Sequence, residues 1–176
     1  GQIFVPINQW FTLRFSTELG FGDGYNETSK LPFFHNFYAG GFGSIRGFKR
    51  NTLGPRSTPP QSYSYIKQDD DTYTYEIEGD KLKINKNANQ GDPFGGNLLI
   101  EGSMELLFPL PFVEDQRSVR STFFVDAGNV FDSSCYSAKA NCFNLVADEL
   151  RYSVGVGVTW ITGFGPLSFS FAKPLN

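Results

Sequence analysis

The residue of this sequence that most requires a charged partner is Arg46, which lies in an aromatic and glycine-rich stretch, residues 33–48. Exposed to water, such a stretch would be an aggregation hazard. Inside a cavity, glycines permit close backbone packing and aromatic rings fill the space. A buried guanidinium needs carboxylates, and its planar fork can hold two of them. Glu105 and Asp126, each on the polar side of a predicted strand, are the candidates, so the pattern predicts an ionic clamp.

Catalysis is not predicted, because the one histidine, His35, lies among loop aromatics with no serine motif nearby. A Ser-His or Asp-His pair would have to use it, and a packed or surface histidine is the better interpretation. Gly41, Gly43 and Gly47 miss the dinucleotide fingerprint and lack its strand-then-helix context. The formal net charge of -3 gives no reason to expect nucleic acid. We therefore predict no enzyme activity, no cofactor and no nucleic-acid partner.

Two cysteines and an acidic triplet are the other candidates for chemistry. Cys135 and Cys142 share a polar stretch, and a chain with one histidine is poorly suited to a zinc site. A local disulfide is predicted instead, which indicates an oxidising compartment. It would stabilise the fold by about 2.5 kcal/mol in the chain-entropy model. Residues 69–71 are all aspartate, but the spacing is not that of an EF-hand loop, so a solvated surface loop is favoured and no metal site is predicted.

The elements that must position these residues alternate between apolar and polar side chains, as β-strands do. In the clearest one, Tyr152 and Trp160 bracket three valines on one face, which is typical of the aromatic girdles of a membrane-spanning strand. The polar faces carry charged and small residues together, as in a wet lumen; a soluble sandwich is the alternative. No apolar run reaches the roughly 18 residues of a membrane-spanning helix. Five strands are predicted, at residues 11–21, 97–108, 119–128, 151–160 and 167–172.

The connections between these strands alternate in length. Long ones, residues 22–96 and 132–150, are separated by short ones, residues 109–118 and 162–166. Outer-membrane barrels have this pattern, with long loops outside and short turns in the periplasm. Strands of this number cannot close a membrane barrel without leaving unpaired edges in lipid. The predicted fold is therefore all-β: an antiparallel transmembrane β-barrel fragment of about five strands, with further strands expected before or after them.

Several stretches of the sequence resemble one known family. Residues 36–41 followed by Ile45, Arg46, Gly47 and Phe48 resemble the inward-folded loop that is the hallmark of the BamA family of outer-membrane protein assembly factors. Residues 123–131 resemble that family's Phe-x-Asp-x-Gly strand, and residues 151–174 resemble its penultimate strands. The resemblance covers nearly the whole chain except the polar segment at residues 57–90.

This resemblance implies a barrel of sixteen strands that inserts other β-barrels into the bacterial outer membrane, with the present strands equivalent to the eleventh to fifteenth. It implies one partial barrel domain, residues 1–176, whose long extracellular loop, residues 22–96, folds into the lumen. Arg46 would then pair with Asp126 and Glu105, with Phe124 packed beside it. The residues predicted for this loop latch are Ile45, Arg46, Gly47, Phe48, Glu105, Phe124, Asp126 and Gly128.

The partners implied by the resemblance are unfolded outer-membrane β-barrel substrates, outer-membrane lipids and, through POTRA domains absent from this sequence, the lipoproteins of the BAM complex. The family's first ten strands and its final strand with a terminal aromatic residue are absent as well. The stretch is therefore not expected to insert proteins by itself. Two alternatives stay open, a two-partner secretion transporter and a porin-like channel. Conductance of the complete protein and the number of upstream POTRA domains would distinguish them.

Overall fold

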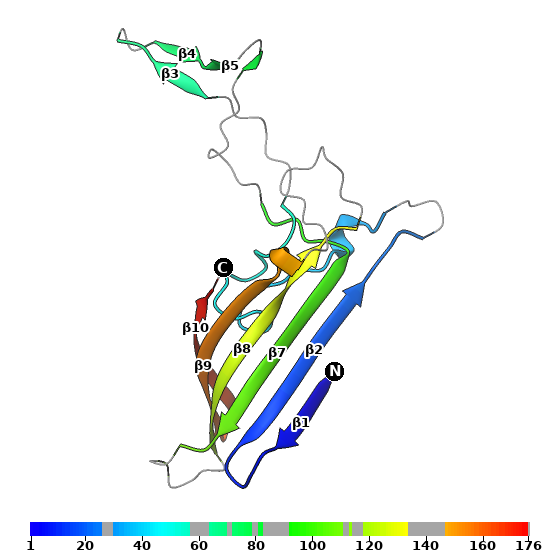
Figure 1. The fold of residues 1–176 in the computed structure, drawn as a ribbon, viewed down its shortest axis with the longest axis vertical. Coiled ribbons are helices and arrows are strands. Elements are labelled where there is room, and N and C mark those ends of the chain that lie inside the picture. Colours follow the sequence, from blue (N-terminus) through cyan, green and yellow to red (C-terminus); the bar gives the residue numbers. More distant parts are fainter. Residues whose placement is uncertain are drawn as a thin grey trace.

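The computed structural model describes residues 1–25, 30–56, 64–69, 72–78, 81–82, 92–110, 113, 118–133 and 147–175. Its main element is a sheet of six strands in the order β1-β2-β7-β8-β9-β10 (Figure 1). Every neighbouring pair is antiparallel, and the sheet does not close on itself. The strands are β1 (Gln2–Pro6), β2 (Thr12–Phe21), β7 (Leu98–Phe108), β8 (Val119–Phe131), β9 (Arg151–Thr162) and β10 (Gly165–Pro174).

The prediction of an all-β, antiparallel fragment of a barrel wall is confirmed, and all five predicted strands are present. The strand that was missed is β1, so the sheet has six strands rather than five. Ile3 and Val5 point to one face of β1, but Phe4 points to the other, so its sequence shows no apolar–polar alternation. Only its pairing with β2, in which Pro6 lies opposite Thr12, identifies it as part of the sheet.

Successive side chains along a strand point to opposite faces, and residues directly opposite each other on paired strands share a face. The alternating sequences therefore give the sheet one polar and one apolar face. On the apolar face large side chains are widely exposed, for example Leu19 at 75% and Phe171 at 80%, as expected of a surface that meets lipid. The polar face is built of rows that cross the strands. One row is Arg14, Glu105, Phe124, Gly155 and Ala172, and the next is Ser16, Ser103, Asp126, Ser153 and Pro174.

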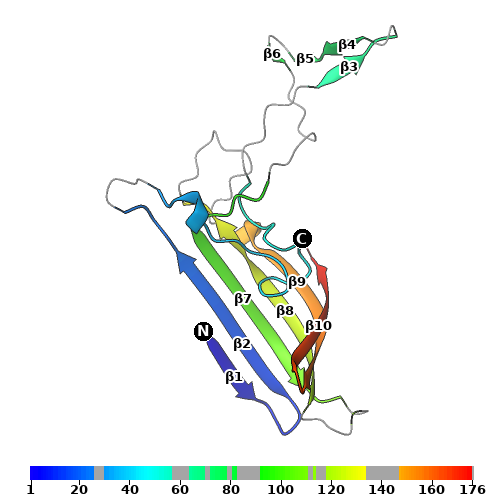
Figure 2. The same cartoon turned by 180° about the vertical axis from the view of Figure 1, so that it is seen from behind.

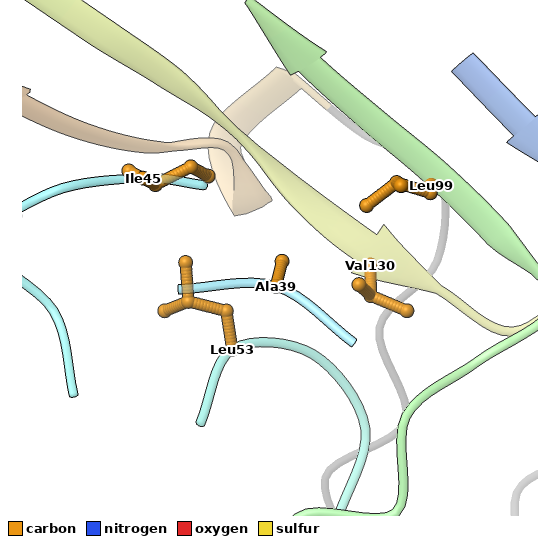
Figure 3. Packing of buried hydrophobic residues seen from close by; sticks show 5 residues of the cluster. All are labelled: Ala39, Ile45, Leu53, Leu99 and Val130. Carbon is orange, nitrogen blue, oxygen red and sulfur yellow. The ribbon is translucent and has the colours of Figure 1, made fainter. Parts of the chain in front are cut away.

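The first half of the long loop lies against the polar face of the sheet. A small buried cluster joins the two, with loop residues Ala39, Ile45 and Leu53 packed against Leu99 of β7 and Val130 of β8 (Figure 3). The loop is also tied to itself by three isolated β-bridges, Phe37 with Gly96, Ala39 with Leu53, and Arg56 with Pro93. The polar face of the sheet therefore supports the loop residues of the predicted site.

Four short strands of the loop lie away from the sheet (Figures 1 and 2). Two short hairpins, β3 (Tyr65–Lys67) with β4 (Tyr73–Tyr75) and β5 (Ile77–Glu78) with β6 (Lys81–Leu82), lie beyond one end of the sheet in both views (Figures 1 and 2). Single turns of 3-10 helix occur at η1 (Phe33–His35) and η2 (Ala147–Glu149). Within the described ranges, no helix has both the length and the apolar character needed to cross a membrane.

Candidate functional site

The acidic candidates meet on the polar face of β7 and β8. These strands pair so that Glu105 lies opposite Phe124 and Ser103 lies opposite Asp126. The two carboxylates therefore stand on neighbouring strands, one row apart, on the side that the loop covers. Both are buried, with the side chain of Glu105 7% exposed and that of Asp126 1% exposed. Two buried carboxylates at this separation are stable only if a cation and hydrogen-bond donors compensate them.

Arg46 supplies that cation. Its Nε and Nη2 atoms donate to Asp126, at 2.8 Å to Oδ2 and 2.7 Å to Oδ1, in the bidentate geometry that suits a guanidinium best. Nη2 also lies 2.8 Å from Oε1 of Glu105 and donates to Oγ of Ser103 at 3.0 Å. The backbone N–H of Arg46 donates to Oδ2 of Asp126 at 3.1 Å. Asp126 therefore holds both the side chain and the backbone of the loop.

Phe124 forms the floor beneath the guanidinium. The central carbon of the Arg46 guanidinium lies 3.5 Å from the centroid of the ring, well within cation–π range, and the ring is fully buried. Gly155 of β9 leaves room for it. A Cβ at Gly155 would lie 2.5 Å from Cζ of Phe124 and 2.3 Å from the carbonyl oxygen of Phe171. The stacking of Arg46 on Phe124 therefore depends on a glycine in the neighbouring strand.

Arg14 of β2 completes the charge balance. Its Nη1 donates to Oε2 of Glu105 at 3.0 Å, so Glu105 bridges Arg14 on the sheet and Arg46 on the loop. Ser103 donates its hydroxyl to Oδ1 of Asp126 at 2.6 Å. Two arginines thus face two carboxylates across three strands. Mutual compensation of this kind is the condition under which buried charges are tolerated.

The residues that flank Arg46 pack against the sheet instead of bonding to it. Ile45 is 1% exposed, and its Cδ1 lies over Gly128, where a Cβ would come within 2.9 Å of it. Gly47 has a φ of 91°, in the left-handed region that favours glycine, and it lies against Ala172 of β10. Phe48 packs against the buried cluster. The turn after Arg46 therefore brings the loop close to β9 and β10 as well.

The whole chain, residues 1–176, matches the Omp85 superfamily domain. The chain belongs to the Omp85 superfamily. Two bacterial relatives of this Omp85 chain are named outer membrane protein assembly factor BamA. The protein of Neisseria meningitidis serogroup B is 35% identical over 189 residues, covering 98% of this chain and 20% of that protein. The protein of Nitratidesulfovibrio vulgaris is 28% identical over 151 residues, covering 86% of this chain and 14% of that protein.

A human relative also matches this chain. The human sorting and assembly machinery component 50 homolog is 26% identical over 145 residues, covering 80% of this chain and 24% of that protein. The resemblance to the BamA family that was inferred from the sequence is thereby confirmed. The Omp85 chain spans about a quarter or less of the length of these relatives.

The structure brings four of the predicted latch residues into direct contact, Arg46 with Glu105, Phe124 and Asp126. Sequence reasoning did not include Arg14 in the site. Its partnership with Glu105 depends on the register between β2 and β7, and the loop at residues 22–96 separates those strands, so no turn geometry reveals that register. The roles of Ser103 and Gly155 carried no recognisable signal, because small residues are common on such a face.

Of the other candidates from the sequence, His35 is not part of this site, and the rest fall wholly or partly outside the described residues. His35 is exposed, and its ring lies 4.7 Å from that of Phe34, centroid to centroid. Cys135 and Cys142 lie outside the described residues, so the predicted disulfide stays a prediction. Two of the three aspartates at residues 69–71 lie outside them too.

Proposed function

We propose that this chain is the loop-anchoring part of a machine that folds and inserts β-barrel proteins into the outer membrane of Gram-negative bacteria. Two bacterial relatives are named for that assembly role, and the whole chain matches the Omp85 superfamily domain. The protein is integral to the outer membrane and performs no chemical catalysis. Its partners are unfolded outer-membrane β-barrel substrates, outer-membrane lipids and the BAM lipoproteins.

The observation that carries the proposal is the clamp of Arg46 on Asp126 and Glu105. It joins the loop to two adjacent strands through groups that neutralise one another. Loss of one partner would leave a buried charge, which typically costs about 3–5 kcal/mol. The clamp therefore works as a latch that keeps the loop on the lumen face and braces β7 against β8. A braced wall here confines any opening of the barrel to other strands, where an incoming strand could pair by β-augmentation.

The test is a double-mutant cycle in the full-length protein, with Arg46→Ala, Asp126→Ala and the pair. We expect a coupling of about 1 kcal/mol or more in the free energy of unfolding, because the two residues share direct hydrogen bonds. Each single variant should also increase protease cleavage of the loop and slow the folding of a client barrel into liposomes that contain the variant protein.

The matched control is Arg120→Ala, which removes an exposed arginine from the same strand as Asp126. It should leave all three measurements unchanged. Additive effects of Arg46→Ala and Asp126→Ala, with wild-type loop cleavage, would show that the two residues are not a latch. Normal client folding combined with an altered conductance of the full-length barrel would instead favour a transporter or channel.

A further inference from the structure

On its other side, the latched loop forms a cavity of about 520 Å³. The side chains alternate along the loop, so Ala39 and Leu53 are buried in the cluster against the sheet while their neighbours Tyr38 and Thr52 line the cavity. Its lining residues are Tyr38, Lys49, Arg50, Asn51, Thr52, Arg56, Asp92 and Pro93. All the described residues that line the cavity belong to the loop, and none of them is part of the site of Arg46.

This cavity has an excess of positive charge. Among the described lining residues, Lys49, Arg50 and Arg56 carry positive charge and Asp92 carries negative charge, so their formal balance is three positive charges and one negative. Lys49 and Arg50 are exposed, and within the described part of the chain neither side chain has a carboxylate partner. Cations held close together repel one another when they outnumber the anions beside them. An anionic ligand would relieve that repulsion.

The backbone beneath the cations is well ordered by its own contacts. Gly40 and Gly41 have φ values of 101° and 107°, and a Cβ at Gly41 would lie 3.0 Å from Cα of Arg50. The N–H of Asn51 donates to the carbonyl oxygen of Gly40 at 3.1 Å, and Asn51 itself takes a left-handed φ of 57°. Thr52 donates its hydroxyl to the carbonyl oxygen of Lys49 at 2.7 Å. The two cations are thus presented from a fixed turn, which lowers the entropy lost on binding.

We propose that this cavity binds a phosphate monoester group. Such a group carries about −1.5 to −2 charges at neutral pH, which matches the excess of two positive charges, and its oxygens suit both the guanidinium fork of Arg50 and the ammonium of Lys49. The ligand is either the headgroup of a phosphorylated lipid or a soluble phosphate compound. The proposal does not depend on the assembly role.

The first experiment titrates inorganic phosphate into the full-length protein in neutral detergent and follows the phosphorus resonance and the heat of binding. The variant Lys49→Gln/Arg50→Gln should weaken phosphate binding by at least about tenfold. The matched control, Arg120→Gln/Lys173→Gln, removes the same two charges from exposed positions elsewhere on the sheet and should bind phosphate as the wild type does. Heat-induced unfolding on gels should be alike for both variants, which shows that any loss of binding is not a loss of fold.

A second arm identifies the source of the phosphate. The protein is placed in vesicles of phosphatidylcholine with and without phosphatidic acid, whose headgroup is a phosphate monoester. If phosphatidic acid displaces inorganic phosphate, the ligand is a lipid; if it does not, the ligand is soluble, and either result supports the site. Equal phosphate affinity in the two variants would overturn the proposal. So would binding of a polyglutamate peptide that depends on Lys49 and Arg50 while phosphate does not bind, because the surface would then recognise an acidic protein.

Discussion

Arg46 and Arg50 stand four positions apart in one loop, yet their surroundings are opposite. Arg46 is held by two buried carboxylates and an aromatic ring, whereas Arg50 lines an open cavity beside two other cations. The difference comes from the sheet, because the side of the loop that faces β7 and β8 meets the buried carboxylates of Glu105 and Asp126, whereas the described lining of the cavity sets Asp92 against three cations. The same side chain is therefore structural on one side of the loop and available to a ligand on the other.

Among the substitutions that test this comparison, Asp126→Ala is expected to lower the free energy of unfolding the most. Asp126 accepts hydrogen bonds from the side chain and backbone of Arg46 and from Ser103. Its loss should lower the free energy of unfolding by about 3–5 kcal/mol, because Arg46 stays buried without its main partner. Urea unfolding of the full-length barrel in lipid vesicles measures this. A loss below about 1 kcal/mol, the range of exposed ion pairs, would show that Arg46 finds solvent easily and that the two arginines are alike.

A smaller loss is expected for Gly155→Ala. The added methyl group would meet the carbonyl oxygen of Phe171 at 2.3 Å and Phe124 at 2.5 Å, and overpacking of this kind costs about 1–3 kcal/mol. The same unfolding experiment measures it. Gly163→Ala is the matched control, because a Cβ at Gly163 would meet nothing within 4 Å. Equal stability of the two variants would mean that the floor under Arg46 is not tightly packed.

Arg14→Gln should lower the free energy of unfolding by a still smaller amount, about 1 kcal/mol. Arg14 is 31% exposed against 14% for Arg46, and Glu105 would keep Arg46 as a partner. Cleavage of the loop by protease should stay at the wild-type rate while the midpoint of urea unfolding falls slightly. If Arg14→Gln released the loop as readily as Asp126→Ala, the charge balance of the whole network would matter more than the direct clamp.

Arg50→Gln is predicted to have the smallest effect. Its free energy of unfolding should stay within about 0.5 kcal/mol of that of the wild type, as for most surface substitutions. Arg46→Gln provides the contrast, since it leaves the buried carboxylate of Asp126 without its cation. Unfolding midpoints of the two variants, measured side by side, test the comparison directly. Similar losses of stability would remove the distinction between the two sides of the loop.

How far the sequence predicted these features depends on which geometry each one requires. Strand parity alone put Glu105 and Asp126 on the polar face, and the chemistry of a buried guanidinium then paired them with Arg46. Arg14 required a register across a long loop, which alternation does not encode. Strand β1 was not predicted because Phe4 interrupts the apolar–polar alternation of its sequence. The cavity around Lys49 and Arg50 depends on β-bridges within the loop itself, and an irregular segment has no periodicity from which such bridges could be inferred.

The bridge between Arg56 and Pro93 has one more consequence. It brings together the two ends of the excursion formed by residues 57–92, so the ends stay neighbours whatever lies between them. By the statistics of loop closure, doubling the length of such an excursion costs only about 0.6 kcal/mol. Insertions and substitutions within residues 57–92 are therefore expected to change the stability of the barrel wall and the latch only slightly. A peptide tag inserted between residues 57 and 92 is therefore expected to leave the latch and the barrel wall intact.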